Sequence, residues 1–358
     1  MANQPRRVEP AAPPGEVCIL RLSAIGDTCH VVPLVRTLQH ALPATRITWV
    51  IGRAEARLMG LLPEVEFITI DKRDLAGSLR QLRGALRGRR FDALLHMQLA
   101  LRASLFAAAI PARRRIGFDR ARARELQWLF TNERIPARRD EHVLDSFFGF
   151  AQALGIDERR VQWNLPLRAA DEDWARGHLP DGQPALVISP CSSHVLRNWT
   201  VAGYAAVAAH AVRRHGLAVL LVGGRSALER DTSEAIARAA GVPVTNLTGQ
   251  DTLPQLLALL ARARLLLSPD SGPAHMATMV GTPVLGLYAA TRVARSGPYL
   301  SRHWCIDRYE QAALRFRGKP AAQLPWQEKI EEPGVMELIE PGAVTARLDE
   351  MLATPLLR

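Results

Sequence analysis

The chain has 358 residues, of which 48% are hydrophobic, and its 46 lysines and arginines outnumber 35 acidic residues to give a net charge of +11. This length is typical of two domains, each able to bury its own core. Residues 1–15 are rich in proline and lack the apolar core of a secretory signal, and no later stretch holds about 18 uncharged apolar residues in a row. We therefore expect a disordered tail over 1–15 on a soluble, cytoplasmic protein.

Short β-branched runs alternate with segments of helical length along the first half of the chain. This alternation predicts a parallel sheet covered by helices on both faces. The expected strands are Val17–Leu22, Ile47–Ile51, Phe67–Ile70 and Ala93–Met97, and a helix is expected over Leu75–Leu86. The four cysteines lie far apart, with no metal-ligand or redox spacing, which indicates free thiols in a reducing compartment.

The alternation pauses over residues 163–184, where prolines, glycines and charges mix, and then resumes. The second series predicts strands Val187–Ser189, Val219–Val222, Leu265–Ser268 and Val284–Leu287, and helices Val201–His215, Ala227–Ala240 and Leu253–Ala261. The fold class is therefore α/β, with two Rossmann-like doubly wound domains over 16–168 and 185–358, joined by a linker over 169–184. A last helix over Ala343–Leu352 could pack back on the first domain. Ligands of such folds bind outside the carboxyl ends of the strands, which places the site in a cleft between the domains.

A Gly-Asp pair, Gly26 and Asp27, follows the first predicted strand. A carboxylate at this point can act as a base over the cleft, or it can cap the helix that follows. A helix N-terminus would make Asp27 a weaker base, so the two roles oppose each other. His30, three residues on, could orient Asp27, meet a substrate, or be a structural histidine.

The segment "LLLSPDSGPAHMATMVGTPVLGLY", residues 265–288, predicts an anion site. A buried strand leads into Asp270, Ser271 and Gly272, and Pro273 then favours the first turn of a helix. The free N–H groups and dipole of that turn attract an anion, Gly272 allows close approach of a phosphate, and His275 could donate to it. A well-capped turn with a surface histidine explains the same residues without a ligand.

Two more predicted strand ends in the second half carry polar groups. Ser192 and Arg197 follow the strand at 187–189, and arginine suits bidentate phosphate contact. Gly223 and Gly224 end another strand, and the Glu229 carboxylate a little further on could accept from ribose hydroxyls. Together these ends indicate a site for a nucleoside diphosphate.

Other phosphate and metal motifs fit the chain poorly. No G-x-x-x-x-G-K-[ST] or G-x-G-x-x-G occurs, which disfavours a P-loop and a hydride-transfer enzyme. The acidic run Asp171, Glu172 and Asp173 matches D-x-D but reads more simply as the first turn of a helix. We therefore expect no metal.

Arginine is concentrated between positions 80 and 139, where fifteen arginines accompany four acidic residues. This surface is either simply solvated or binds an anionic partner. A nucleic-acid-binding module would explain the charge, but the chain has only four tyrosines and no aromatic platform.

The motifs "ILRLSAIGDTCHVVPLVRTLQ", "RRIGFD", "LTGQDTLPQLLALLARARLLLSPDSGPAHMA" and "GTPVLGLY" resemble, in this order, the ADP-heptose:lipopolysaccharide heptosyltransferases of glycosyltransferase family 9, which have the GT-B fold. The resemblance covers nearly the whole chain. It implies that Asp27 is the catalytic base and that Ser271, Gly272 and His275 hold the donor pyrophosphate. At the basic residue before Trp199 the family more usually has lysine, and this chain has Arg197; Glu229 aligns only loosely with the family's ribose-binding acid.

The resemblance implies an inverting, metal-independent transfer of heptose from ADP-heptose to an acceptor sugar of the lipopolysaccharide inner core, without a cofactor. The expected donor site comprises Ser192, Arg197, Glu229, Asp270, Ser271, Gly272 and His275, and the expected acceptor site comprises Gly26, His30, Arg113, Arg114, Arg115 and Arg120. The predicted partners are a nucleotide sugar and an anionic glycolipid, with peripheral contact at the cytoplasmic face of the inner membrane and a monomeric protein. The alternatives are a related GT-B transferase with another nucleotide sugar and a non-catalytic carbohydrate-binding or assembly protein.

Overall fold

The computed structural model describes residues 13–354. Residues 1–12 of the predicted tail lie outside this range. The rest of that segment is tied to the first sheet, because the Gly15 amide donates to the Asp92 carboxylate at 2.8 Å. The Thr45 hydroxyl also donates to the Pro14 carbonyl at 2.5 Å.

The first sheet is parallel and six-stranded, in the order β3-β2-β1-β4-β5-β6. Its strands are β1 (Glu16–Leu20), β2 (Arg46–Gly52), β3 (Val65–Ile70), β4 (Phe91–His96), β5 (Ala112–Gly117) and β6 (Glu133–Arg134). The helices around it are α1 (Ile25–Ala41), α2 (Arg53–Met59), α3 (Leu75–Ala85), α4 (Leu101–Ala109) and α5 (Val143–Ala153). We call this sheet with its helices the first unit.

Alternation along β1 explains why helices cover both faces of the first sheet. Val17 and Ile19 belong to the apolar cluster with α1 and α5, whereas Cys18 and Leu20 belong to the cluster with α3 and α4. Successive side chains of a strand point to opposite faces, so a strand apolar on both faces is buried on both.

The second sheet repeats this topology in the order β12-β11-β10-β7-β8-β9. Its strands are β7 (Ala185–Ile188), β8 (Ala218–Leu221), β9 (Thr245–Asn246), β10 (Leu265–Pro269), β11 (Val284–Tyr288) and β12 (Ile306–Asp307). The helices are α6 (Ala169–His178), α7 (Val201–His215), α8 (Ala227–Ala240), α9 (Leu253–Arg262), α10 (Gly272–Met279), α11 (Val293–Ser296), α12 (Tyr309–Arg317) and α13 (Pro341–Ala353). We call this part the second unit.

Local signals in the sequence set the limits of the helices in the second unit. Thr200 caps α7 by accepting from the Gly203 amide, and the helix ends at Gly216 with a left-handed φ of 64°. Ser226 and Glu229 form a capping box at the start of α8, which ends at Gly241. Side-chain acceptors at the start and a left-handed glycine at the end satisfy the free backbone groups of both ends.

The predicted α/β class with two Rossmann-like sheets is confirmed, and the structure differs from the expectation in detail. The short strands β6, β9 and β12 were not predicted. β5 was not predicted, because three arginines in succession hide its apolar pattern. The segment expected as a linker contains α6, which packs against α9. α13 packs on α7, β11 and β12 of the second unit, so the expectation that it reaches the first domain is wrong.

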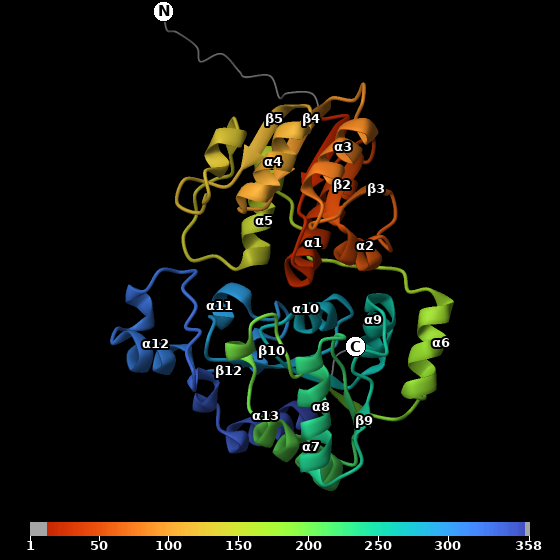
Figure 1. Ribbon diagram of the computed structural model, residues 1–358, viewed down its shortest axis with the longest axis vertical. Helices are drawn as coiled ribbons and strands as arrows, with labels where there is room; N and C mark the ends of the chain where they lie inside the picture. The colour runs from red at the N-terminus through yellow and green to blue at the C-terminus, as the bar shows by residue number, and fades with distance from the viewer. Residues whose placement is uncertain (1–12, 355–358) are drawn as a thin grey trace, which may run out of the picture.

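The two units contact each other where α1 of the first unit meets α10 of the second. In Figure 1, α1 and α5 of the first unit lie directly above α10 and α11 of the second. α1 contacts α10, and one apolar cluster runs from α1 through α9 and α10. The carboxyl ends of both parallel sheets therefore meet at one cleft.

Candidate active site

Asp27 lies in the first turn of α1, where its carboxylate has two partners. It accepts from the Ala24 amide at 3.4 Å, which closes the helix start, and it forms an ion pair with Arg21. The side chain is still 33% exposed and lines a cavity. Capping and access to the cleft therefore coexist at this carboxylate.

Arg21 holds the Asp27 carboxylate in place and is itself fixed. Its Nη1 donates to the Met97 carbonyl at 2.5 Å, and its guanidinium lies 5.6 Å from the centre of the Phe147 ring. Only 11% of the side chain is exposed. A buried, doubly anchored guanidinium presents its remaining N–H groups in one direction, so Arg21 orients Asp27.

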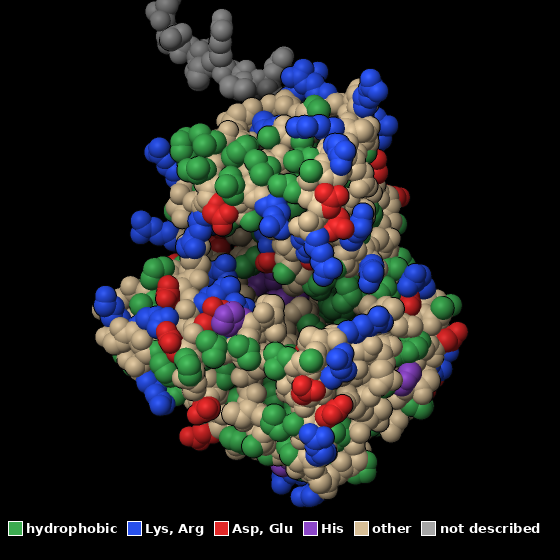
Figure 2. Space-filling view, in the orientation of Figure 1, with side chains coloured by type: hydrophobic (Ala, Val, Ile, Leu, Met, Phe, Trp, Pro, Cys, Tyr) green, Lys and Arg blue, Asp and Glu red, His purple; other side chains and the backbone are tan. Residues whose placement is uncertain are grey.

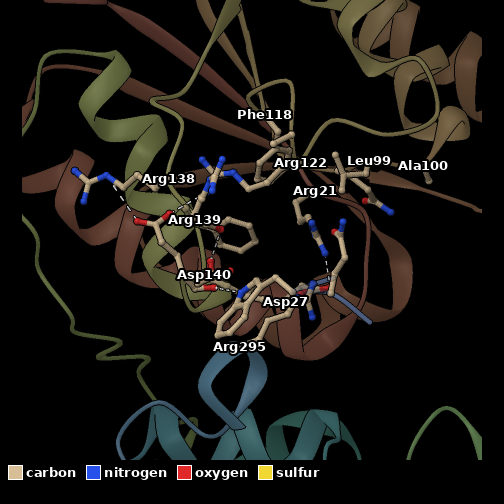
Figure 3. A pocket seen from close by; sticks show the side chains of 18 of the residues that line it. Arg21, Asp27, Leu99, Ala100, Phe118, Arg122, Arg138, Arg139, Asp140 and Arg295 are labelled. Carbon is tan, nitrogen blue, oxygen red and sulfur yellow. Dashed lines mark hydrogen bonds and ion pairs between the residues drawn. The ribbon is translucent and has the colours of Figure 1, made fainter. Parts of the chain in front are cut away.

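The cavity beside Asp27 has a volume of about 560 Å³ and lies between the units. Figure 3 shows Arg21 and Asp27 on one side of it, Arg122, Arg138 and Arg139 on another, and Arg295 rising from the second unit below. The lining contains five arginines against three acids, Asp27, Asp140 and Glu141. A site with this balance favours an anionic ligand.

Arg295, on α11, connects the two halves of the site electrostatically. Burial lowers the pKa of its guanidinium, and the carboxylates of Asp27 and Asp270 act against that effect. Arg295 of the second unit therefore interacts electrostatically with Asp27 of the first unit and with Asp270 before α10.

The N-terminus of α10 has no side-chain cap. The Ser271 side chain does not cap the helix; its hydroxyl lies 2.7 Å from that of Ser268. Neither side chain therefore occupies the first N–H groups, and Pro273 needs no partner there. Uncapped N–H groups in the first turn are the donors expected of an anion site.

Gly26 and His275 join the two helix starts. A Cβ on Gly26 would lie 2.4 Å from the His275 Cδ2 atom, and one on Gly272 would lie 3.3 Å from the Ile25 side chain. Glycine at position 26 therefore permits α1 to rest on α10. Gly26 is buried and does not line the cavity, and its place in the acceptor site stays a prediction.

Asp270 supports the α10 turn from below. Its Oδ2 accepts from the Ser296 hydroxyl at 3.1 Å, and its Oδ1 lies 3.8 Å from His275 Nε2. Burial alone would raise the pKa of Asp270, but His275, Thr291 and Arg197 outweigh it and hold the pKa below its usual value. This ionised carboxylate keeps His275 against the turn.

Arg197 and Ser192 are occupied within the second unit. The Arg197 Nε donates to Glu331 at 2.7 Å, and the guanidinium is only 12% exposed. The Ser192 hydroxyl donates to the His194 carbonyl at 2.9 Å. A phosphate contact from Arg197 therefore requires its other N–H groups, or a partial release from Glu331.

Glu229 closes the capping box of α8. Its Oε1 accepts from the Gly224 amide at 2.7 Å, and its Oε2 accepts from the Ser226 hydroxyl. The carboxylate still lies at the carboxyl end of β8, half-buried beside the glycine turn. Its contact with a ribose stays a prediction.

His30, His142 and His275 form a buried cluster between the units. The His30 ring lies 4.4 Å from that of His275 and 5.2 Å from that of His142. His30 is 3% exposed and does not line the cavity, and its acceptor contact stays a prediction. His142 accepts from the Leu144 amide and donates through Nε2 to the Gly297 carbonyl at 2.9 Å, which ties α5 to the second unit.

Burial makes this cluster sensitive to acid. Burial, followed by the charges of His275 and His142, holds the pKa of His30 well below its usual value. Burial likewise lowers the pKa of His142 to about 4, although its bond to Gly297 acts in the other direction. Both side chains are therefore neutral at pH 7.

We expect the free energy of unfolding to fall as the pH drops from about 6.5 to about 4. In this range His142 binds a proton in the unfolded chain but stays neutral in the folded protein, because its pKa there is lowered to about 4. At a pH of about 5 the loss at His142 amounts to about 2 kcal/mol. His142→Asn keeps an N-cap acceptor and removes the titration, so urea unfolding at two pH values should show a shallower dependence. The exposed His303→Asn is the control, and an unchanged pH dependence in His142→Asn would contradict this account.

Three of the four arginines predicted to contact the acceptor have partners within the first unit, and their contact with an acceptor stays a prediction. Arg114 binds Glu133 with two hydrogen bonds of 2.8 Å, and Arg115 donates to the carbonyls of Ile110 and Phe130. Arg113 faces Asp92. These residues are the second to fourth of the six residues of β5, before the carboxyl end of the strand. Arg120 is exposed and does not line the cavity, so its role stays a prediction.

Among residues 13–354, the group with metal-ligand proximity is His210, His215 and Asp349. It joins α7 to α13, and both histidine Nε2 atoms lie 2.6 Å from the same Asp349 oxygen. The acidic run of the sequence opens α6, where Asp171 pairs with Arg168 and Asp173 with Arg176. Its helical interpretation is confirmed.

Several residues of the site were missed in the sequence. Arg21 precedes the Gly-Asp turn at the end of β1, and its place beside the turn was a usable signal. Arg295, His142 and Trp326 carry no motif. Trp326 Nε1 donates to the Glu141 carbonyl at 2.8 Å across the cleft, and only the fold brings these segments together.

The architecture defines the class of fold: two facing Rossmann-like units, as in GT-B glycosyltransferases. The fold matches a glycosyltransferase family 9 structure from Veillonella parvula, with a TM-score of 0.79, 20% identity and coverage of 94% of this chain and 97% of that one. It also matches E. coli heptosyltransferase WaaC with ADP, at a TM-score of 0.73, 19% identity and coverage of 94% and 99%.

Sequence comparison identifies the family. The model of glycosyltransferase family 9 (heptosyltransferase) matches residues 79–324. The lipopolysaccharide core heptosyltransferase OpsX of Haemophilus influenzae is 38% identical over 338 residues, covering 94% of this chain and 97% of the relative. Lipopolysaccharide heptosyltransferase 1 of Pseudomonas aeruginosa is 25% identical, with coverage of 95% and 98%. The chain belongs to glycosyltransferase family 9 and is a transferase.

Proposed function

We propose that this protein transfers heptose from ADP-heptose, with inversion and without a metal, to a sugar of the lipopolysaccharide inner core. The name of the Haemophilus influenzae relative supports the heptose and the lipopolysaccharide core, and the solved WaaC structure with ADP supports the nucleotide. The reaction then belongs at the cytoplasmic face of the inner membrane.

The observation that carries this proposal is the contact between the two helix starts. Gly26 packs against His275, which brings the helix start that carries Asp27 in the first unit close to the uncapped first turn of α10 in the second. A base on one side and an anion site on the other are the two groups that direct displacement at an anomeric carbon needs. Displacement from the side opposite the leaving group inverts that carbon.

The donor diphosphate would bind at the N-terminus of α10. Gly272 and the uncapped N–H groups provide close donors, and His275, fixed by Asp270, adds another beside them. Glu229 and Ser192, at neighbouring strand ends, would contact the nucleoside. Arg295 stands between this turn and Asp27 and would meet the diphosphate as the cleft fills.

The acceptor would occupy the cavity of about 560 Å³, a volume suited to a few sugar rings. Arg122, Arg138 and Arg139 line it. Arg122 already donates to Asp119, Glu141 and the Pro136 carbonyl, so Arg138 and Arg139 would contact carboxylates or phosphates of the inner core. These residues take the place of Arg113, Arg114 and Arg115 in the predicted acceptor site.

In the reaction we propose, Asp27 accepts the proton of the acceptor hydroxyl as that oxygen attacks the anomeric carbon. The bond from the anomeric carbon to the phosphate oxygen breaks, and its electron pair leaves with ADP. The N–H groups of α10 and the charge of Arg295 stabilise the added charge on the diphosphate. Arg21 holds Asp27 toward the hydroxyl, and positioning of both substrates supplies the rest.

A nucleotide panel tests the donor part of this proposal. After dialysis against EDTA, ADP should raise the melting temperature clearly more than UDP or GDP at equal concentration, because a ligand that binds only the folded state stabilises it according to its affinity. ADP-heptose should act like ADP. Equal shifts for all three nucleotides, or a response only after magnesium or manganese is added, would contradict the donor assignment or its metal independence.

A further inference from the structure

Exposed apolar side chains gather on one face of the first unit. Among residues 13–354, nine large hydrophobic side chains are exposed, and five of them lie on α4 and in the segment around the 3₁₀ helix Gln127–Phe130. These five are Leu101, Leu105, Leu126, Trp128 and Leu129, between 39% and 58% exposed. We call them the α4 patch. Figure 2 shows the hydrophobic side chains gathered over α4.

Internal bonds hold the two segments of the α4 patch together. The Leu101 amide donates to the Glu125 carboxylate at 2.6 Å. Arg115 donates to the Ile110 carbonyl behind α4 and to the Phe130 carbonyl at the end of the 3₁₀ helix. Glu125 and Leu126 adopt left-handed φ values of 48° and 60°, which presents Leu126 to solvent at a cost in backbone energy. Hydrogen bonds therefore hold the α4 patch in a defined shape.

Positive charge borders the α4 patch. Arg120 and Arg124 are exposed and form no ion pair within the described part of the chain, and Arg102 is exposed on α4 itself. Figure 2 shows Lys and Arg side chains around the hydrophobic area. An apolar centre with an unneutralised basic border is complementary to an anionic lipid surface.

The α4 patch adjoins the proposed acceptor cavity. Leu99 and Ala100 line the cavity, and Leu101 follows directly at the start of α4. Arg124 acts on the buried Arg295, which places that part of the border near the cleft. A surface lying against the patch would therefore lie beside the cavity mouth.

We propose that the α4 patch docks this protein on an anionic lipid bilayer and presents the acceptor cavity to a lipid-anchored acceptor. No helix within residues 13–354 is long and apolar enough to cross a membrane. Leu126, Trp128 and Leu129 would enter the headgroup boundary, where an indole is favoured, and the arginines would meet lipid phosphates. The inference rests on the proposed glycolipid acceptor, and it adds the surface that reaches it.

Vesicle binding by the full chain, without substrates, tests this docking. Sedimentation with phosphatidylglycerol-containing vesicles should show binding that weakens with salt and is lost on pure phosphatidylcholine. Leu126→Asn/Trp128→Ser should bind about tenfold more weakly, because apolar contact is removed. Asparagine tolerates the left-handed conformation at position 126, so the variant should fold. The matched control is Leu228→Asn/Leu314→Ser, at exposed leucines of the second unit.

The same variants separate docking from catalysis. Leu126→Asn/Trp128→Ser should retain transfer to a water-soluble acceptor fragment and lose about tenfold in kcat/KM on the same acceptor in vesicles. Unchanged vesicle binding, or an equal loss in the control, would overturn the proposal. So would concentration-dependent dimers of the parent chain that the patch variant abolishes. Absence of transfer to any acceptor would refute the proposed function and leave the binding result intact.

Discussion

Replacing Asp27 by asparagine should lower kcat by about a thousandfold, because a positioned general base contributes roughly 10²–10⁴ and an amide cannot take the acceptor proton. Asparagine keeps an oxygen for the Ala24 amide, so the start of α1 should survive. Donor affinity should change little, since the proposed diphosphate site belongs to the second unit. Steady-state kinetics and ADP titration measure the two quantities.

Asp74→Asn is the matched control for this substitution. Asp74 starts α3 and accepts from the Gly77 amide at 2.8 Å, and it does not line the cavity. The same chemical change there should leave transfer unaltered, because asparagine caps as well as aspartate. If Asp27→Asn kept near parental turnover, Asp27 would be a cap and no base.

Gly26→Ala should separate the two helix starts. The new Cβ would lie 2.4 Å from the ring of His275, which is 6% exposed and already packed edge-to-face against His30. Overpacking of this kind costs about 1–3 kcal/mol of the free energy of unfolding. It should also displace Asp27 from α10 and lower kcat/KM by about a hundredfold, since misplacement near 1 Å has that cost.

Gly84→Ala controls for the loss of a helical glycine. Gly84 lies in α3, and an added Cβ there meets nothing within 4 Å. That variant should gain roughly 0.5–1 kcal/mol of stability, because alanine favours a helix. Urea unfolding and transfer kinetics on both variants give the comparison; a Gly26→Ala protein with normal stability and activity would show that the close contact does not matter.

The sequence predicts most of the fold because local signals agree with the packing. Short apolar runs mark β1 and β10, and Thr200 and Gly216 mark the ends of α7. The Gly-Asp turn and the 270–275 segment could likewise be predicted to share one cleft, since carboxyl ends of parallel strands are where ligands bind.

What the sequence did not predict depends on contacts between distant segments. The high density of arginine in residues 80–139 suggested an acceptor surface. In the structure, however, Arg114 donates to Glu133 and Arg115 donates to backbone carbonyls. The cavity is lined by other arginines, including Arg295 from the opposite unit. The number of arginines can be read from the sequence. Which of them have unpaired N–H groups facing the cleft depends on the fold.

The most direct test of the proposed reaction is transfer itself, measured by mass spectrometry and by the NMR anomeric signals of the product. The protein, ADP-heptose and a deacylated inner-core acceptor are incubated in EDTA. We predict that the acceptor gains one heptosyl residue, that ADP is released in equal amount, and that the anomeric configuration is inverted relative to the donor. Retained configuration, transfer only from a uridine or guanosine donor, or no transfer while ADP-heptose binds would contradict the proposal.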